Sequence, residues 1–323
     1  MREAALEIDV LCVGHAAYDL AMAVDHHPGE DEKCAATAMA ACGGGPAANA
    51  AVTVARLGGV SAFAGYLGND VHGCLHFDEL AREGVHTRWV ARGNHPTPLS
   101  VILVKPNGDR TVVNHRIRTP VLSTDEIDFS HCRPKVILFD GHEPPISLDL
   151  AAKARAGGIP TVLDAGSVHG GTVDLLPLMD YVVASARFAR DFTGESDPQR
   201  AVEKLGRSGL FAAVTLGEKG LVWKDTSTEA RALPAYPVAV VDTTGADDAF
   251  HGAFALGLAR LCDMETILRH ASAAAALTCT RLGARIAIPT AREVDDVLGM
   301  RYVCPDGCPP SSAPGNTGSG HSK

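Results

Sequence analysis

Short runs of apolar residues recur along the chain, and most of them end in glycine or aspartate. They lie at residues 8–14, 61–68, 135–141, 160–166, 180–185 and 211–217. Near-continuous hydrophobic runs of this length are typical of parallel strands that are buried on both faces of a sheet. Segments with helical character, such as 46–58 and 148–158, lie between them. The alternation predicts an α/β fold with a doubly wound parallel sheet, whose ligands bind beyond the carboxyl ends of the strands.

Composition narrows the class of protein further. The chain has 323 residues, of which 46% are hydrophobic, and this is enough for the core of one large domain. The formal net charge of −9 argues against a broad nucleic-acid-binding face. No apolar stretch approaches the roughly 18 residues of a membrane span, and the acidic start does not resemble a signal peptide. The nine scattered cysteines suit buried thiols in a reducing cytoplasm, where we expect the protein to act.

Two segments interrupt the strand–helix alternation. Residues 15–38 contain polar residues and Pro/Gly breaks, and residues 98–119 have the pattern of two strands joined by Pro-Asn-Gly-Asp, a hairpin signal. We expect both to form a lid over the site. Residues 304–323 have linker composition and are predicted to be a disordered tail, which leaves residues 1–303 as a single domain.

The strongest chemical signal is the stretch at 240–259, where an apolar strand is expected to precede Asp242-Thr243-Thr244-Gly245 and an apolar helix to follow. Backbone N–H groups of Gly245, Ala246 and Asp247 would form an anion hole at the helix N-terminus. Asp248, in the first turn, would take a proton from a hydroxyl placed beside that hole. The alternative is that the two aspartates only complement the helix dipole.

A second signal is the glycine-rich stretch at 42–59. Gly43, Gly44 and Gly45 would let the backbone approach a ligand closely, and Asn49 would hydrogen-bond a polyol. The alternative is a plain glycine turn before a helix.

Together these motifs resemble the ribokinase-like (phosphofructokinase-B-type) carbohydrate kinase family over about residues 8–292. The resemblance implies an αβα sandwich with a small β-sheet lid, and transfer of the γ-phosphoryl group of ATP to a sugar with Mg²⁺. It assigns Asp248 as the base and Gly245–Asp247 as the anion hole. It also implies that Asp19 binds a sugar hydroxyl, and that three more residues contact the sugar: Gly44, Gly45 and Asn49.

The same resemblance covers the nucleotide side. The stretch at 213–223 matches the family's strand–glycine–hairpin, which implies phosphate and ribose contacts for Thr215, Gly217 and Gly220. The stretch at 270–289 matches the helix and loop that flank adenine, with Ala275 and Gly283. Asp242 and Thr244 match the position of a K⁺ ion in the family, but Ala287 stands where a small polar residue is expected.

The chain departs from the family pattern in two places. Asp247 replaces a glycine and brings a negative charge near the phosphoryl group. The family's Asn-x-x-Glu, which organises Mg²⁺, is replaced by Ser185-Ala186-Arg187-Phe188. Asp140 and Asp164 stand at strand ends and are more simply explained as turn carboxylates than as Mg²⁺ ligands. These departures motivate a second hypothesis, a sugar- or nucleotide-sensing protein with little catalysis. His251, one turn beyond the base, is expected to pack in the core, with a tuning role as the alternative.

The choice of sugar depends on a narrower resemblance, to kinases of 6-deoxy-6-sulfofructose, over residues 43–48, 240–253 and 279–285. It implies sulfonate contacts for Lys33 and Asn114, with His142 in place of an arginine. Arg116 and Arg118 on the lid would offer further positive charge. A ketose or anionic sugar is therefore predicted, with neutral fructose or ribose, or a nucleoside, as alternatives. A homodimer formed through the lid edges is also expected.

Overall fold

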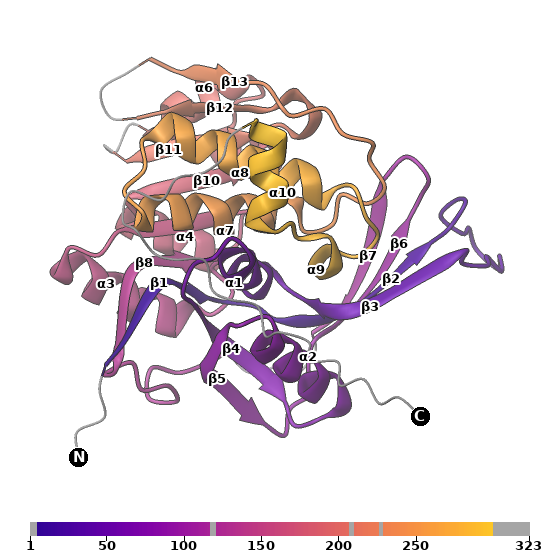
Figure 1. Ribbon diagram of the computed structural model, residues 1–323, viewed down its shortest axis with the longest axis horizontal. Helices are drawn as coiled ribbons and strands as arrows, with labels where there is room; N and C mark the ends of the chain where they lie inside the picture. The colour runs from indigo at the N-terminus through magenta and orange to yellow at the C-terminus, as the bar shows by residue number, and fades with distance from the viewer. Residues whose placement is uncertain (1–4, 117–120, 207–209, 226–228, 300–323) are drawn as a thin grey trace, which may run out of the picture.

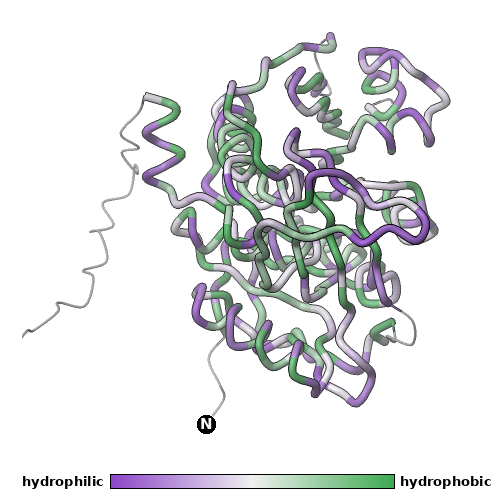
Figure 2. Tube along the Cα trace, turned by 90° about the vertical axis from the view of Figure 1, so that its right-hand side faces the viewer, coloured by the Kyte–Doolittle hydropathy of each residue, from purple (hydrophilic) through white to green (hydrophobic). Residues whose placement is uncertain are grey.

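The computed structural model describes residues 5–116, 121–206, 210–225 and 229–299. The predicted tail at 304–323 and Arg118 lie outside these ranges. The ribbon shows a large sheet with helices on both faces and a small sheet that extends away from it (Figure 1). This arrangement confirms the predicted αβα sandwich with a β lid. Hydrophobic residues gather inside the molecule and hydrophilic ones on its outer loops (Figure 2).

The central sheet has nine strands within the described residues. In the order in which they lie side by side, they are β13 (Arg231–Leu233), β12 (Leu221–Lys224), β11 (Phe211–Thr215), β10 (Tyr181–Ser185), β9 (Thr161–Ala165), β8 (Cys132–Phe139), β1 (Leu6–Val13), β4 (Ser61–Gly68) and β5 (His86–Gly93). All neighbouring pairs are parallel except β11 with β12 and β12 with β13, which are antiparallel. Each predicted apolar run therefore forms a strand of this sheet.

The strand order reverses at β1. From β1 the chain builds outward through β4 to β5, and then returns to β8 on the other side of β1. A sheet that is wound in both directions leaves a crevice at the carboxyl ends of the strands beside this reversal. The fold therefore places a binding site near the ends of β1 and β8.

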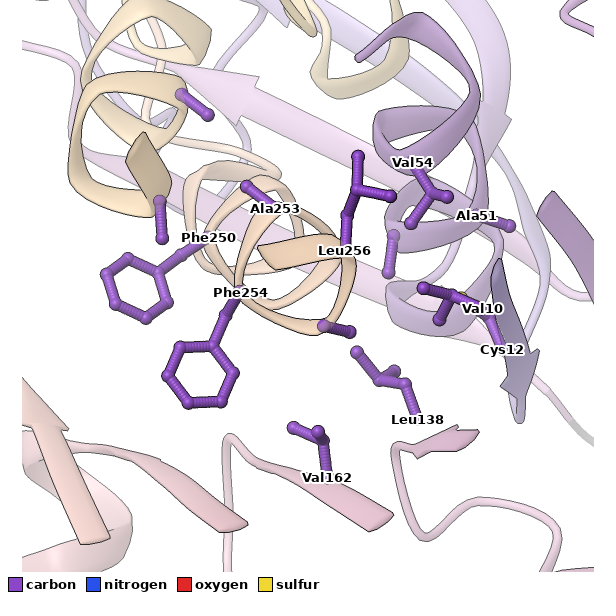
Figure 3. Close-up of a cluster of buried hydrophobic side chains, with 14 of the residues drawn as sticks. Val10, Cys12, Ala51, Val54, Leu138, Val162, Phe250, Ala253, Phe254 and Leu256 are labelled. Atoms are coloured by element: carbon purple, nitrogen blue, oxygen red, sulfur yellow. The ribbon is translucent and has the colours of Figure 1, made fainter. Parts of the chain in front are cut away.

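Alternate residues of each strand pack into two separate hydrophobic cores, one on each face of the central sheet. Val10 and Cys12 of β1 pack with one helical layer, and Leu11 and Val13 pack with the other. The first layer contains α1 (Pro46–Arg56), α2 (Val71–Arg82), α7 (Ala246–Ala259), α8 (Met264–Thr278) and α10 (Ala291–Leu298). The second contains α3 (Pro144–Gly157), α4 (Gly170–Leu175), α5 (Ala186–Thr193) and α6 (Pro198–Leu205). Figure 3 shows α7 against the first core, with Phe250 and Phe254 directed toward the strands.

The lid is a sheet of four strands in the order β3 (Ala38–Gly44), β2 (Ala17–Ala23), β6 (Leu99–Val104) and β7 (Arg110–His115). The hairpin predicted within 98–119 is confirmed, because β6 and β7 pair antiparallel. The predicted first lid segment, 15–38, was too short, because β3 continues to Gly44. Its glycines hid the strand, since glycine is depleted in strands and favours turns.

The strand expected before α7 is absent. Residues 234–240 have no regular secondary structure, although Val240 and Val241 are apolar. Pro234 and Pro237 lack backbone N–H groups and cannot donate to a strand ladder. Val241 instead donates its N–H to the carbonyl oxygen of Cys279, at 2.8 Å. The polypeptide therefore enters α7 from a loop that is tied to the end of α8. Within the described ranges, no helix combines the length and apolar character that a membrane span requires.

Phe254 is the clearest test of the first core. Its ring is fully buried, 5.5 Å from the ring centre of Phe211 and 5.9 Å from that of Tyr181. We expect Phe254→Ala to lower the free energy of unfolding by about 3–5 kcal/mol, because it removes apolar contacts and leaves a cavity. Urea denaturation measures this loss. Leu261→Ala is the control, because Leu261 is 92% exposed, and a loss below about 1 kcal/mol for Phe254→Ala would contradict the packing.

Candidate active site

The N-terminus of α7 lies at the carboxyl ends of the central strands. Thr215, the last residue of β11, places its hydroxyl oxygen 3.5 Å from the Asp247 carboxylate. Gly245 precedes the helix in the left-handed conformation, with φ of 79°. A Cβ at this position would lie 2.7 Å from the Cβ of Ala284, so the backbone and the space both require glycine.

The predicted anion hole coincides with this helix end. Gly245 is the N-cap of α7, and Ala246 and Asp247 are its first residues. The first N–H groups of an α-helix have no partner within the helix, and they carry its partial positive charge. The geometry suits an anion, while the binding of a phosphoryl group there remains a prediction.

Asp248, in the same turn, is held by a residue from the other half of the chain. The side-chain amide of Asn49, on α1, donates a hydrogen bond of 2.7 Å to Oδ2 of Asp248. Burial raises the pKa of the Asp248 carboxyl above its ordinary value, and the bond from Asn49 opposes this rise. A carboxylate with a raised pKa is a stronger base once it is ionised.

Arg285 fixes the direction in which the Asn49 amide points. Its Nε donates to Oδ1 of Asn49 at 2.9 Å, so the amide nitrogen of Asn49 is the atom left to face Asp248. Arg285 is fully buried, and its Nη2 lies 3.1 Å from Nε2 of His76. The carboxylates of Glu79 and Asp19 interact favourably with its charge. A hydrogen-bonded chain therefore runs from Arg285 through Asn49 to Asp248.

The sequence alone did not reveal this role of Arg285. The sequence places Arg285 only within the stretch 279–285, which carries the narrower resemblance. Its one usable signal is that a lone arginine stands in the otherwise small and apolar stretch Gly283–Pro289. An arginine that is nine-tenths buried or more must have partners, because an unpaired charge in the interior is costly.

The inner face of the lid presents a row of polar side chains. Asp19 on β2 pairs with Ser100 on β6, and Ser100 pairs with Asn114 on β7. Residues that are paired across a sheet point to the same face. Burial raises the pKa of Asp19 to about 6, although a hydrogen bond from Ser100 opposes the rise. Asp19, Ser100 and Asn114 together offer acceptors and donors for the hydroxyl groups of one ligand.

Gly44 and Gly45 lie where this row meets α1. A Cβ on Gly44 would stand 2.0 Å from Oδ2 of Asp19, so only glycine leaves room for that carboxylate. Gly45 is the N-cap of α1, with φ of 92°. The predicted sugar-side residues Asp19, Gly44 and Asn49 are thus close together in the fold.

Asp140 is a structural carboxylate, as expected. Its Oδ2 accepts from the backbone N–H of His15 at 2.7 Å and of Ala47 at 3.2 Å, and its Oδ1 accepts from that of His142 at 2.9 Å. It therefore joins the loop after β1, the start of α1 and the loop after β8. These are the segments that border the crevice.

The residues predicted to bind a sulfonate are only partly brought together. Arg116, just after β7, donates to the carbonyl oxygen of His142 at 3.0 Å, and its Nη1 lies 3.1 Å from Nδ1 of His142. His142 also stacks on His169, with ring centres 4.7 Å apart. Asn114 is exposed on β7, and Lys33 is exposed in the loop between β2 and β3.

The predicted nucleotide residues lie at the end of β11 and in the turn that follows. Thr215 ends β11, Gly217 begins a short 3₁₀ turn, and Gly220 has φ of 84° before β12. Ala275 lies on α8. Gly283, one of the predicted adenine contacts, lies against the lid, because a Cβ there would be 2.9 Å from the Cβ of Ala40 on β3. The nucleotide roles of these five residues remain predictions.

Asp242 and Thr244, the predicted K⁺ position, form a closed set of hydrogen bonds. Oδ1 of Asp242 accepts from the Thr244 N–H at 2.9 Å and from its hydroxyl at 2.6 Å. Oδ2 accepts from the Gly283 N–H at 2.9 Å. Asp242 is fully buried, and Ala287 brings no side-chain oxygen. A K⁺ site at these residues remains a prediction.

The position of the missing Asn-x-x-Glu is occupied by a helix cap. The hydroxyl of Ser185 accepts from the N–H of Phe188 at 3.0 Å and donates to the carbonyl oxygen of Gly166 at 2.8 Å. Arg187 is exposed. In the described part of the chain, no group of three or more His, Cys, Asp or Glu residues is arranged to hold a metal ion.

Comparison with known proteins agrees with this geometry. A family model described as pfkB family carbohydrate kinase matches residues 7–291. Ribokinase from Bacillus subtilis (strain 168) is 28% identical over 296 residues, which cover 90% of this chain and 99% of the relative. Fructokinase-2 from Oryza sativa subsp. japonica is 29% identical over 284 residues, which cover 79% of this chain and 84% of the relative.

A solved structure extends the likeness to the fold. The structure of Arabidopsis thaliana ribokinase complexed with ribose and ATP has a TM-score of 0.78 and 26% identity. The match covers 92% of this chain and 100% of the Arabidopsis chain. These relatives are ribokinases and a fructokinase, so the narrower likeness to 6-deoxy-6-sulfofructose kinases remains a prediction.

Asp19 provides a test of the site that needs no ligand. Its pKa rises from 3.8 to about 6 in the fold, so the ionised carboxylate lowers the free energy of unfolding. This destabilisation is complete above about pH 6 and disappears as the pH falls below 3.8. We expect Asp19→Asn to raise the free energy of unfolding by about 1–3 kcal/mol at neutral pH and by much less near about pH 4. Urea denaturation at both pH values measures this. Asp296→Asn, on the exposed face of α10, is the control, and a gain that did not depend on pH would contradict the assignment.

Proposed function

Because the chain belongs to the pfkB family of carbohydrate kinases, we propose that it transfers the γ-phosphoryl group of ATP to a sugar hydroxyl at the N-terminus of α7. One observation carries this proposal. The carboxylate of Asp248 is hydrogen-bonded to Asn49 in the first turn of α7, whose N–H groups carry the partial positive charge of the helix N-terminus. A base and an anion site in one turn are what phosphoryl transfer to a hydroxyl needs.

The reaction proceeds by in-line displacement. Asp248 takes the proton of the sugar hydroxyl, and the sugar oxygen forms a bond to the γ-phosphorus while the bond to the β-phosphate oxygen breaks. ADP leaves, and the proton stays on Asp248 until it exchanges with solvent. The N–H groups of Gly245, Ala246 and Asp247 stabilise the charge on the transferred group. The lid row of Asp19, Ser100 and Asn114 orients the sugar, which converts binding energy into alignment.

ATP would bind beside the end of β11, where Thr215 and the turn at Gly217–Gly220 lie. Mg²⁺ would enter with the phosphates and neutralise part of their charge, as phosphate-bound Mg²⁺ does in kinases. The described side chains form no protein cage for the ion, and the side chains of Asp242 and Thr244 are committed to hydrogen bonds. No step above therefore depends on a metal ion held by this chain.

The acceptor sugar that the site favours is a neutral pentose or ketohexose. The polar row on the lid offers hydrogen bonds to hydroxyl groups, and the relatives are named ribokinase and fructokinase. An anionic sugar such as 6-deoxy-6-sulfofructose would require cations that are free to bind it, whereas Arg116 is engaged with His142. A nucleoside is disfavoured because a nucleobase usually stacks on aromatic surface, and Tyr18 is the one aromatic residue on the lid strands.

The test is ADP release from Mg-ATP with ribose, fructose, fructose phosphates, 6-deoxy-6-sulfofructose, 2-keto-3-deoxygluconate and adenosine. With the sugar that turns over, Asp248→Asn should lower kcat by at least about 10³-fold, because the base is lost, and should leave sugar binding by calorimetry within about threefold. Asp174→Asn, an exposed aspartate on α4, is the matched control. Turnover by Asp248→Asn at the normal rate would show that another group is the base.

Asp247 supports one other candidate, a sensing protein with little catalysis. Its exposed carboxylate stands next to Thr215, at the predicted phosphate position, and repels a phosphoryl group. On this hypothesis the panel gives no ADP although sugar or ATP raises the melting temperature, and Asp247→Gly restores turnover.

The outer face of the lid supports a homodimer. Leu20, Val101 and Val113 form one row across this face, and Met22, Met39 and Leu103 belong to the next. Val113 is 62% exposed and Met39 is 64% exposed. Water-exposed apolar rows of this kind are typical of surfaces that another protein covers. We infer that a second copy of the lid covers them.

Sedimentation velocity tests the dimer. The unmodified protein should sediment as a dimer, and Val113→Glu should raise the dimer dissociation constant by at least about tenfold, because it buries a charge in an apolar contact. Leu261→Glu is the control on a distant exposed leucine. A wild-type monomer, or a dimer that Val113→Glu does not weaken, would contradict the inferred interface.

A further inference from the structure

His251 lies one turn beyond Asp248 on α7 and faces hydrogen-bond acceptors on both of its ring nitrogens. Nδ1 lies 2.6 Å from the carbonyl oxygen of Asp247. Nε2 lies 3.1 Å from the carbonyl oxygen of Val183, on β10, and 3.5 Å from Oδ1 of Asp164, on β9. The side chain is 2% exposed, so water cannot replace these partners. The packing role predicted from the sequence is therefore only part of the role of His251, because both ring nitrogens also contact hydrogen-bond acceptors.

The contacts decide the charge of the ring. A neutral imidazole has one N–H donor and one lone pair, whereas an imidazolium has two donors. Carbonyl oxygens only accept, so a neutral His251 would direct a lone pair at an oxygen atom. A buried lone pair that faces an oxygen atom destabilises the folded state, because no water molecule can offer either atom a hydrogen bond. The imidazolium satisfies both carbonyl oxygens at once.

The charges around the ring favour the same state. Among the described residues, the charged groups near it are Asp164 on β9 and Asp247 and Asp248 on its own helix, and all three are acidic. Burial alone would lower the pKa of His251, but Asp164 and the two carbonyl oxygens outweigh burial and raise it. Burial raises the pKa of Asp164 to about 7, and the charge of His251 opposes this rise. The two carbonyl contacts give each ring nitrogen of His251 an acceptor for a proton.

We propose that His251 is a permanently protonated positioning residue, which forms a buried ion pair with Asp164, braces the first turn of α7 and keeps Asp248 ionised. The bracing follows from the contact with the carbonyl oxygen of Asp247, a residue of the anion hole. The effect on Asp248 follows from the sign of the charge, because a nearby cation favours the carboxylate over the protonated acid. The charge of His251 is independent of the proposed function, whereas its effect on catalysis rests on it.

Nitrogen-15 NMR of the ring tests the charge directly. In a two-bond ¹⁵N–¹H spectrum of the labelled full-length protein at about pH 8, ordinary histidines are neutral because their pKa is near 6.5. We expect one histidine to keep two equivalent, protonated ring nitrogens at this pH, and we expect His251→Gln to remove that signal. A spectrum in which every histidine shows the neutral pattern would overturn the proposal, even if the protein proves to be an active kinase.

The pH profile of kcat, measured with the sugar that the panel identifies, tests the consequence. His251→Gln should move the acid limb to higher pH by about one unit, which is a roughly tenfold loss of kcat below that limb, with the KM for sugar nearly unchanged. His86→Gln, an exposed histidine at the start of β5, should leave the profile unchanged. An acid limb that stays in place in His251→Gln would overturn the role in ionising Asp248.

A double-mutant cycle separates the ion pair from general loss of packing. Each single variant leaves one buried charge without its partner, whereas the double variant His251→Gln with Asp164→Asn removes both charges. Urea denaturation should show the double variant to be at least as stable as the less stable single variant. Strictly additive losses would mean that His251 and Asp164 do not form a pair. This measurement also works if no sugar turns over, so failure of the kinase assignment and failure of the ion pair are distinguishable.

Discussion

The hydrogen bond from Asn49 to Asp248 joins residues that lie 199 positions apart in the chain, and the rest of the site depends on it. It forms because α1 and α7 pack closely. Gly252 makes the approach feasible, since a Cβ there would lie 2.5 Å from the carbonyl oxygen of Ala50. The core under α7 holds the helix at this height above the sheet (Figure 3). Arg285 then fixes the direction of the Asn49 amide. The position of the Asp248 carboxylate therefore depends both on the packing of α1 against α7 and on the hydrogen bonds of Asn49.

The site contains many aspartates, which differ in their hydrogen-bond partners and in their burial. Asp140 and Asp242 are saturated by backbone N–H groups, as carboxylates at strand ends and turns often are. Asp164 faces His251, and Asp19 and Asp248 keep free acceptor capacity at raised pKa values. Asp19 on the lid and Asp248 on α7 are therefore two poorly solvated carboxylates that lie near enough to interact. This division separates structural carboxylates from those that are available for chemistry.

Much of the fold was predictable from local patterns, because buried parallel strands and capped helices leave periodic signals in the sequence. The six apolar runs became strands, and the Pro-Asn-Gly-Asp turn became the lid hairpin. The errors came where prolines or glycines outweighed apolar character, at the missing strand before α7 and at the overlooked strand β3. The roles of Arg285 and His251 were not predictable, because their partners Asn49, Val183 and Asp164 are distant in sequence. Such contacts exist only once the sheet order and the helix packing are known.

The most direct measurement is a crystal structure of the Asp248→Asn variant with the accepted sugar and a non-hydrolysable ATP analogue. The account predicts a sugar hydroxyl within hydrogen-bond distance of residue 248, with the γ-phosphoryl group against the N–H groups of Gly245, Ala246 and Asp247. It also predicts that Asp19 binds other hydroxyl groups of the same sugar, and that Arg285 still holds Asn49. A sugar bound away from α7, or a γ-phosphoryl group that does not meet the helix N-terminus, would contradict the central claim.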